Sequence, residues 1–188
     1  METINLTDNV TIIEGAAFMY ATLRVAFVPK CTKQGMDSSG SDSGGDYQVD
    51  GWFSTSTLES ISVSPSHPIY DSRDNCNAVI HTATNALEVG SKNTVIPKSV
   101  TKIMGYAFMC PIEHLTIPTN VTTIGQDAFN YCDNLLDITF ESATPPTFLG
   151  DPIYECPLLT KIYVPKESAS LYKNMSQLKN HLSKIVGI

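Results

Sequence analysis

The sequence predicts an α/β solenoid in which short repeats stack and each contributes a short strand to a parallel sheet. The phrase VTKIMGYAF at Val100 returns as VTTIGQDAF at Val121, with the Val, Thr, Ile, Ala and Phe in register and the Gly shifted by one position. The segment after each phrase alternates apolar and polar residues, as a half-buried strand does. A Pro follows several of these segments and ends the strand, because it has no N–H to donate. A single unit cannot bury its own apolar side, but stacked units can.

More degenerate copies of the phrase extend the pattern along one domain spanning 1–188. The repeats are expected at about 4–29, 31–63, 95–118, 119–140 and 145–165, with one strand each, at 61–63, 115–117, 138–140 and 162–164 where the alternation is clearest. In the last repeat Ile153 takes the place of the Phe. A polar insert at 37–50, which contains DSSGSDSGGD (37–46), interrupts the second repeat and is expected to form a flexible loop.

Residues 168–185 are predicted to form an amphipathic capping helix with Ser168 as its N-cap. Its apolar stripe consists of Leu171, Met175, Leu178, Leu182 and Ile185. A solenoid ends in an open strand edge, so we interpret this helix as a cover for that edge. A helix that binds a partner or a membrane surface is the alternative.

The residue types of catalytic and metal sites are present without the patterns that such sites require. Cys110, Cys132 and Cys156 recur at one repeat position, which favours a ladder of buried thiols over a metal site, and Ala21 fills that position in the first repeat. The four histidines fit no metal motif, and neither a GxSxG elbow nor a phosphate-binding loop occurs. DSRDNCN, from Asp71, and the polar insert lack EF-hand spacing and indicate turns. We therefore expect no enzyme, no metal and no cofactor.

The composition restricts the partners and the compartment. A net charge of -7, with 12 basic residues among 19 acidic ones, argues against nucleic acid and against a polybasic membrane contact. No apolar run reaches the roughly 18 residues of a membrane-spanning helix, so no membrane insertion is expected. The first residues show no signal peptide, which favours either a cytoplasmic chain or one whose leader has been removed.

One repeat pattern resembles the BspA-like class of leucine-rich repeats. The pattern is AF-x-x-C-x-x-L-x-x-I-x-I/F, and its members in one repeat are Phe129, Cys132, Leu135, Ile138 and Phe140. The stretch HPIYDSRDNCNAVIHTATNALEVG at 67–90 is similar to the family's hairpin phrase, and IYVPKESASLYKN is similar to its usual ending. The resemblance implies a leucine-rich-repeat solenoid with a hairpin insertion at 67–90, without catalysis. It also implies a bacterial cell-surface or secreted location, with the cytoplasm as the alternative.

The strand face of the solenoid is the first candidate for a binding site. Period two sends one residue outward between two buried ones, and in register these residues form a ladder. Leucine-rich repeats in general bind through this face, so the resemblance makes the ladder the first candidate site. The alternative, of at least equal weight, is that small hydroxyl-bearing residues merely suit an exposed sheet. The candidate residues are Phe27, Ser62, His114, Thr116, Asp137, Thr139, Lys161 and Tyr163. Phe27 and Tyr163 are the most informative, because exposed aromatic residues favour contact. The hairpin turn at Thr84 and Asn85, expected to project from the solenoid, is the second candidate.

Two functions fit this pattern. The preferred one is a binding module that recognises a protein or a glycan, as in adhesion. The alternative is a structural spacer or a self-assembling repeat unit without an external ligand.

Overall fold

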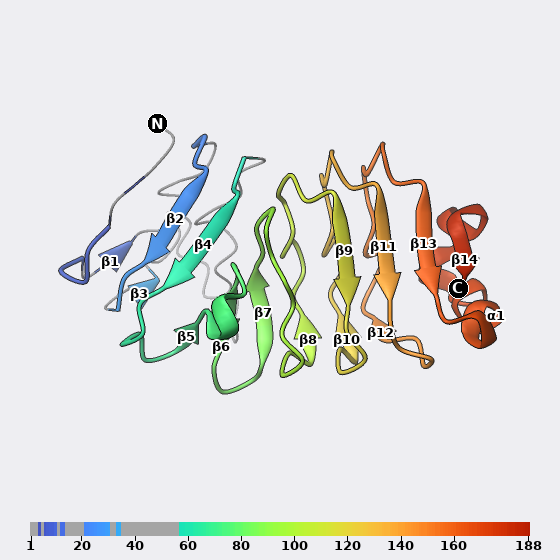
Figure 1. The fold of residues 1–188 in the computed structure, drawn as a ribbon, viewed down its shortest axis with the longest axis horizontal. Helices are drawn as coiled ribbons and strands as arrows, with labels where there is room; N and C mark the ends of the chain where they lie inside the picture. The colour runs from blue at the N-terminus through green and yellow to red at the C-terminus, as the bar shows by residue number, and fades with distance from the viewer. Residues whose placement is uncertain (1–3, 5, 11, 14–20, 31–32, 35–56) are drawn as a thin grey trace.

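The computed structural model describes residues 4, 6–10, 12–13, 21–30, 33–34 and 57–188. These residues form a stack of coils that runs from the N-terminal end in blue to the C-terminal end in red (Figure 1). Successive coils place longer strands on a front face and shorter strands on a back face. The predicted insert at 37–50 lies outside the described residues.

The front face consists of four-residue strands and one shorter closing strand, all parallel. The strands are β2 (Val25–Val28), β4 (Ser60–Val63), β9 (His114–Ile117), β11 (Asp137–Phe140), β13 (Lys161–Val164) and β14 (Ile185–Gly187). β2 pairs with β4, and the other four form one sheet in the order β14-β13-β11-β9. The predicted strands are confirmed, and each begins one residue earlier than expected. In β9 the predicted alternation holds, because Leu115 and Ile117 are buried while Thr116 is exposed.

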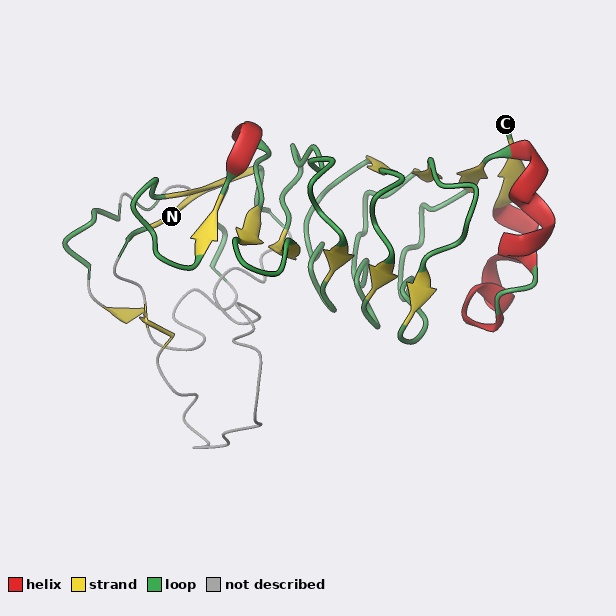
Figure 2. Cartoon of the chain, turned by 90° about the horizontal axis from the view of Figure 1, so that it is seen from below, coloured by secondary structure: helices red, strands yellow, loops and turns green. Residues whose placement is uncertain are grey.

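The back face carries a second set of strands that the sequence analysis did not predict. β8 (Lys102–Ile103), β10 (Thr123–Ile124) and β12 (Thr147–Phe148) are parallel, two-residue strands. β1 (Ile12–Ile13) and β3 (Lys33–Gln34) pair in the same way near the N-terminal end. The expectation of one strand per repeat is therefore incomplete, since the repeated Thr-x-Ile phrase is itself a short strand. Figure 2 shows the two layers, with the chain passing between them in each coil.

Close approach of successive coils explains the shifted glycine in the repeated phrase. A Cβ atom on Gly125 would lie 2.3 Å from the backbone nitrogen of Gly105, and one on Gly105 would lie 2.8 Å from the carbonyl oxygen of Gln126. Such distances are shorter than van der Waals contact, so a side chain at either position would separate the two coils.

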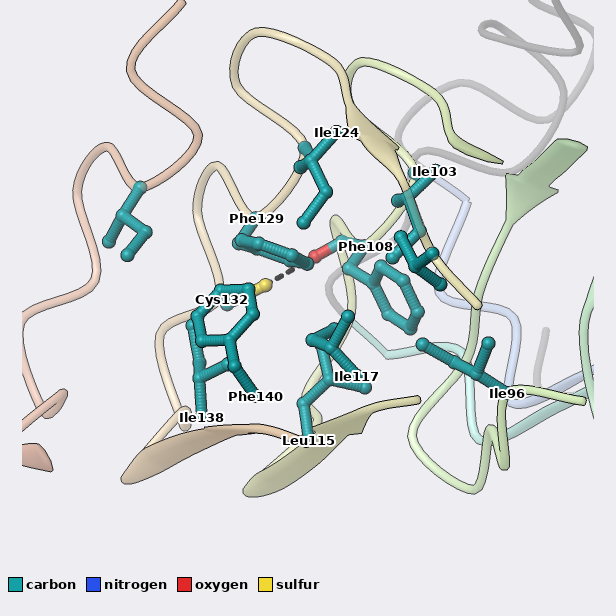
Figure 3. Close-up of a cluster of buried hydrophobic side chains, with 14 of the residues drawn as sticks. Ile96, Ile103, Phe108, Leu115, Ile117, Ile124, Phe129, Cys132, Ile138 and Phe140 are labelled. Atoms are coloured by element: carbon teal, nitrogen blue, oxygen red, sulfur yellow. Dashed lines mark hydrogen bonds between the residues drawn. The ribbon is translucent and has the colours of Figure 1, made fainter. Parts of the chain in front are cut away.

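The core lies between the two faces and is built from one set of side chains per coil (Figure 3). Phe108 and Phe129, the repeated Phe residues, are fully buried, and their ring centroids lie 5.8 Å apart. Ile153 occupies the same position in the next coil and is also buried, as the sequence predicted. The Phe108 N–H donates to the Ala128 carbonyl at 2.9 Å, so the turns that carry these side chains are also joined from coil to coil.

The hairpin at 67–90 is part of the back sheet and does not project from the stack, which corrects that expectation. β5 (Tyr70–Asp71) and β7 (Ala86–Val89) flank β6 (Val79–His81) in antiparallel pairs, and β7 then pairs in parallel with β8. Ile80 and Leu87 are fully buried, so the hairpin contributes to the core. Its turn, which includes the exposed Thr84, reaches solvent, and so do Ile69 and Asp74 earlier in the segment.

The C-terminal helix is present but is shorter than predicted and is not continuous. A 3₁₀ turn η2 (Lys166–Ser168) leads into α1 (Ala169–Lys173), and a 3₁₀ segment η3 (Ser176–Lys184) follows before β14. Ser168 is at the N-cap position of α1, but its side chain makes no capping hydrogen bond. The predicted stripe is divided by this break: Leu178 and Ile185 are buried, whereas Leu171 and Leu182 are exposed.

The cap therefore covers the end of the stack in two ways. β14 hydrogen-bonds to the open edge of β13, with Ile185 opposite Ile162. The buried Tyr172 of α1 packs against Phe140 at 5.3 Å between ring centroids and donates its hydroxyl to the Ser142 carbonyl at 2.8 Å. The prediction combined the apolar spacing of a helix with the open strand edge of a solenoid, and it missed both the closing strand and the tyrosine.

Candidate functional site

Six of the eight predicted site residues lie side by side on β9, β11 and β13 (Figure 1). They form two rows across the front face. The upper row is His114, Asp137 and Lys161, and the lower row is Thr116, Thr139 and Tyr163. Neighbouring strands lie ~4.8 Å apart, so each row presents three side chains at close, regular spacing. We call these six residues the front rows.

The remaining two residues, Phe27 and Ser62, lie opposite each other on β2 and β4. They do not continue the front rows strand by strand, because the chain segment after Gly90 lies beside β4 without strand pairing. There the Lys92 N–H donates to the Leu58 carbonyl at 2.9 Å. The predicted ladder is therefore divided into two parts. Ser62 is exposed and Phe27 is half-buried.

Exposure differs among the front rows. Thr116, His114 and Lys161 are exposed, whereas Thr139 and Tyr163 are half-buried. Tyr163 lies between Thr139 and Val186, which is its partner on β14. The two aromatic candidates thus present part of each ring to solvent.

Ion pairs run along the edge where the front strands begin. Arg24 and Glu59 lie 2.8 Å apart, and Lys92 and Glu113 lie 2.7 Å apart. The second pair's hydrogen bond raises the pKa of Lys92 and lowers the pKa of Glu113. Exposed pairs of this kind contribute little to the stability of a fold, because solvent screens their attraction. Their main effect here is to neutralise charge beside the candidate site.

A third pair lies within the front rows. His114 Nδ1 is 2.7 Å from a carboxylate oxygen of Asp137. Lys161 is the register partner of Asp137 on its other side. In the upper row the Asp137 carboxylate therefore lies between an imidazole and a lysine, and the lower row supplies two hydroxyl-bearing threonines and a tyrosine.

A shallow cleft of about 410 Å³ opens at the same edge, above β2 and β4. Its lining consists of Thr22, Arg24, Thr57, Glu59, Lys92, Pro111 and Asn134. The sequence did not predict this cleft. Its residues come from several coils, so no contiguous motif could reveal it.

The cysteine ladder is confirmed as part of the core. Cys110, Cys132 and Cys156 are buried free thiols. Cys132 Sγ donates to the Phe108 carbonyl (Figure 3), and Cys156 Sγ donates to the Phe129 carbonyl at 2.9 Å. Burial raises the pKa of Cys110 to about 12, so this thiol stays protonated at neutral pH and is a poor nucleophile.

The DSRDNCN segment is held by its own arginine. Arg73 donates to both carboxylate oxygens of Asp71, at 2.8 and 2.6 Å, and also to the Asn85 side chain at 2.7 Å. Asp74, Asn75, Asn77 and Asn85 have positive φ, which Asp and Asn tolerate better than most residues. The turn interpretation of this segment is confirmed.

Searches for other kinds of site give negative results over the described ranges. No three His, Cys, Asp or Glu side chains there come together in a group that could hold a metal ion. No helix in the described part of the chain is both long and apolar enough to traverse a bilayer.

Several solved structures are similar to this chain. A leucine rich cell surface protein from Faecalibacterium prausnitzii A2-165 aligns with a TM-score of 0.50 and 19% identity over 100% of this chain and 58% of that one. A leucine-rich repeat protein from Eubacterium ventriosum aligns with a TM-score of 0.44 and 18% identity, over 95% of this chain and 52% of that one. The pneumococcal vaccine antigen PcpA gives a TM-score of 0.33 and 14% identity, over 95% and 58%. The chain thus spans a little over half the length of each.

At 19% identity, the likeness to the Faecalibacterium prausnitzii protein shows a shared fold and no more. No curated protein sequence gives a significant match. The model of the BspA type leucine rich repeat region matches residues 88–186 with 6 copies, which include the hairpin's last strand, the front rows and most of the cap. Because this match covers more than half of the 188 residues, the chain belongs to the BspA-type leucine-rich-repeat family.

Proposed function

We propose that this chain is a non-catalytic recognition module that binds a protein or a glycan through the front rows at a bacterial cell surface. The observation that carries the proposal is the lower row, in which Thr116, Thr139 and Tyr163 occupy equivalent positions on three hydrogen-bonded strands. A sheet fixes the spacing of these side chains before the ligand arrives. Binding then needs little ordering of the protein, which lowers its entropic cost.

The electrostatics of the face favour a ligand without strong charge. The pairs Arg24–Glu59, Lys92–Glu113 and His114–Asp137 satisfy much of the charge along the edge from within the protein. Hydroxyl groups and half-exposed aromatic rings remain available for contact. Such a surface suits polar, uncharged groups, as on glycans or on polar patches of proteins.

The proposed location is supported by family and fold. The chain belongs to the BspA-type family, and a protein of similar fold from Faecalibacterium prausnitzii is a leucine rich cell surface protein. The competing function is a self-assembling spacer whose faces contact other copies of the chain. Light scattering separates the two, because self-assembly makes the measured mass rise with protein concentration.

The test is binding to a glycan array and to a panel of extracellular-matrix proteins, with a Phe27→Ser/Tyr163→Ser double variant measured in parallel. We expect this variant to bind at least about tenfold more weakly, which corresponds to about 1.4 kcal/mol. The control is Leu149→Ser, which removes an exposed apolar side chain that follows β12 on the back face and should leave binding unchanged. A ligand held equally by the double variant would contradict the assignment of the site. A folded, monomeric sample that binds nothing would contradict the proposed function.

A further inference from the structure

A second surface, separate from the front rows, lies where the coils turn from the back face to the front. Three tyrosines are exposed there: Tyr106 at 46%, Tyr131 at 46% and Tyr154 at 52%. Asp127 belongs to the same turns. We call these four residues the tyrosine surface. The proposed function makes no use of them.

Coil-to-coil hydrogen bonds place these residues together. The Tyr106 N–H donates to the Asp127 carbonyl, and the Tyr131 N–H donates to the Tyr154 carbonyl, both at 3.2 Å. The Tyr106 hydroxyl donates to Asp127 Oδ2 at 3.0 Å, and Gln126 Nε2 donates to the same oxygen at 3.1 Å. The Asp127 carboxylate therefore lies beside the exposed Tyr106 ring and accepts from two side chains.

The acidic groups of this surface also affect Tyr154. The neighbouring Glu155 carboxylate is the main cause of its raised pKa, and Tyr131 and Asp127 raise the pKa further. The Tyr154 hydroxyl thus lies in the electrostatic field of Tyr131 and Asp127. The surface as a whole combines apolar rings with acidic oxygens.

The backbone at these positions indicates that folding does not require the rings. Tyr106 and Tyr131 have φ values of 57° and 53°, in the left-handed region. A residue with a Cβ costs roughly 1–2 kcal/mol there, and Gly or Asn is the usual solution. About half of each side chain is exposed, so burial offsets this cost only in part. Strained backbone of this kind clusters at ligand sites.

From this geometry we infer that the tyrosine surface binds a neutral pyranose oligosaccharide. The apolar C–H face of a sugar ring packs on an exposed aromatic ring, and the sugar hydroxyls donate to carboxylate oxygens and accept from amide N–H groups. Asp127 and Gln126 supply both kinds of partner. Asp127 and Glu155, with a chain charge of -7, repel sulfated or sialylated chains.

The same charges argue against a second copy of the chain as the occupant. A two-fold contact through this surface would bring the Asp127 and Glu155 carboxylates of both copies close together, and like charges in contact are unfavourable. The inference rests on the proposed function, because it assumes that the chain recognises ligands. It narrows the ligand to glycan and adds a contact surface outside the front rows.

The experiment follows the tyrosine ring signals by NMR in ring-labelled protein during titration with maltohexaose, cellohexaose, laminarihexaose and mannohexaose. Sialyllactose and a heparin hexasaccharide are the charged comparisons. We expect at least one neutral hexasaccharide to shift the Tyr131 and Tyr154 signals, and a Tyr131→Ser/Tyr154→Ser variant to bind at least about tenfold more weakly. Leu171→Ser, which removes an exposed side chain on α1 outside both surfaces, should retain this binding.

Three results would overturn the inference. The first is the absence of any shift with all four neutral probes at millimolar concentration. The second is binding that only the Phe27→Ser/Tyr163→Ser variant loses, which would leave the proposed function intact and refute the tyrosine surface. The third is a concentration-dependent mass that the Tyr131→Ser/Tyr154→Ser variant abolishes, since that result would make the surface a contact between copies.

Discussion

Replacing Phe129 with Ala tests the stacking that holds this solenoid together. The ring is fully buried and packs against Phe108 at 5.8 Å between centroids. A Phe→Ala change in such a core removes the transfer free energy of the ring and leaves a cavity, at a cost of about 3–5 kcal/mol. The lost aromatic pair accounts for about 0.5–1.5 kcal/mol of that cost. Since domains are stable by about 5–15 kcal/mol, this single change removes a large part of the total.

The loss of stability caused by Phe129→Ala should be concentrated at one place in the stack. Phe129 is in a middle coil, with Phe108 before it and Ile153 after it. In a linear array each coil is stabilised mainly by its neighbours, so the change weakens two interfaces at once. We therefore expect broader unfolding in addition to a lower midpoint, because the coils beyond the defect are uncoupled from the rest.

Urea unfolding followed by far-UV circular dichroism measures the effect. Tyr131→Ala is the matched control, because it removes an aromatic ring two positions away that is 46% exposed. The control should lie within about 0.5 kcal/mol of the parent chain. A Phe129→Ala variant that loses less than about 1 kcal/mol, or no more than the control, would refute the stacked-core account.

Further predictions concern the cap, pH and backbone strain. Tyr172→Phe removes the hydroxyl that donates to the Ser142 carbonyl, and should lower the free energy of unfolding by about 1 kcal/mol in urea titrations. His67 Nδ1 accepts backbone N–H bonds at 3.1 and 2.9 Å, and burial lowers its pKa below 6.5. The folded state thus disfavours protonation of His67. The stability that neutral His67 provides is fully present above about pH 6.5 and is lost as the pH falls toward the lower folded-state pKa. Urea midpoints measured from pH 8 to pH 5 should show this loss, and His67→Asn, which retains an acceptor without titrating, should reduce it; equal slopes would contradict the assignment. Tyr131→Asn should leave stability unchanged or raise it by up to about 1 kcal/mol, because Asn tolerates the φ of 53° better; a clear loss in the same titration would show that the ring supports the fold.

The sequence predicted the front strands well because period two and the repeated phrase are local signals. Thr116, Thr139 and Tyr163 were expected to share a row, and the strand register places them in one. The back strands were missed because a two-residue strand has no periodicity of its own. Once the repeat was aligned, the recurring Thr-x-Ile phrase was the signal that could have revealed them.

The cap shows where apolar spacing misleads. The positions from Leu171 to Ile185 fit an α-helical stripe, yet the α-helix ends at Lys173. A 3₁₀ segment follows, and the last residues become β14. The open edge of β13 offers backbone hydrogen bonds that a helix cannot use. The requirement to satisfy that edge outweighs the helical pattern, and it is a property of the assembled stack.

The two candidate sites differ in how much of each could be predicted from the sequence. Period two led to the front rows directly, whereas the ion pair between Arg24 and Glu59 joins residues far apart in the chain and has no sequence signature. Tyr106 and Tyr131 fall at different positions relative to the repeated Phe. Only the hydrogen bonds between successive coils join Tyr106 to Asp127 and Tyr131 to Tyr154.

The measurement that most directly tests recognition by the front rows is parallel binding of the parent chain and the Phe27→Ser/Tyr163→Ser variant to one array of glycans and matrix proteins. The account predicts a specific ligand for the parent chain and at least about tenfold weaker binding by the variant, while both remain folded and monomeric. Equal binding by the two proteins, or no binding by either, would contradict it.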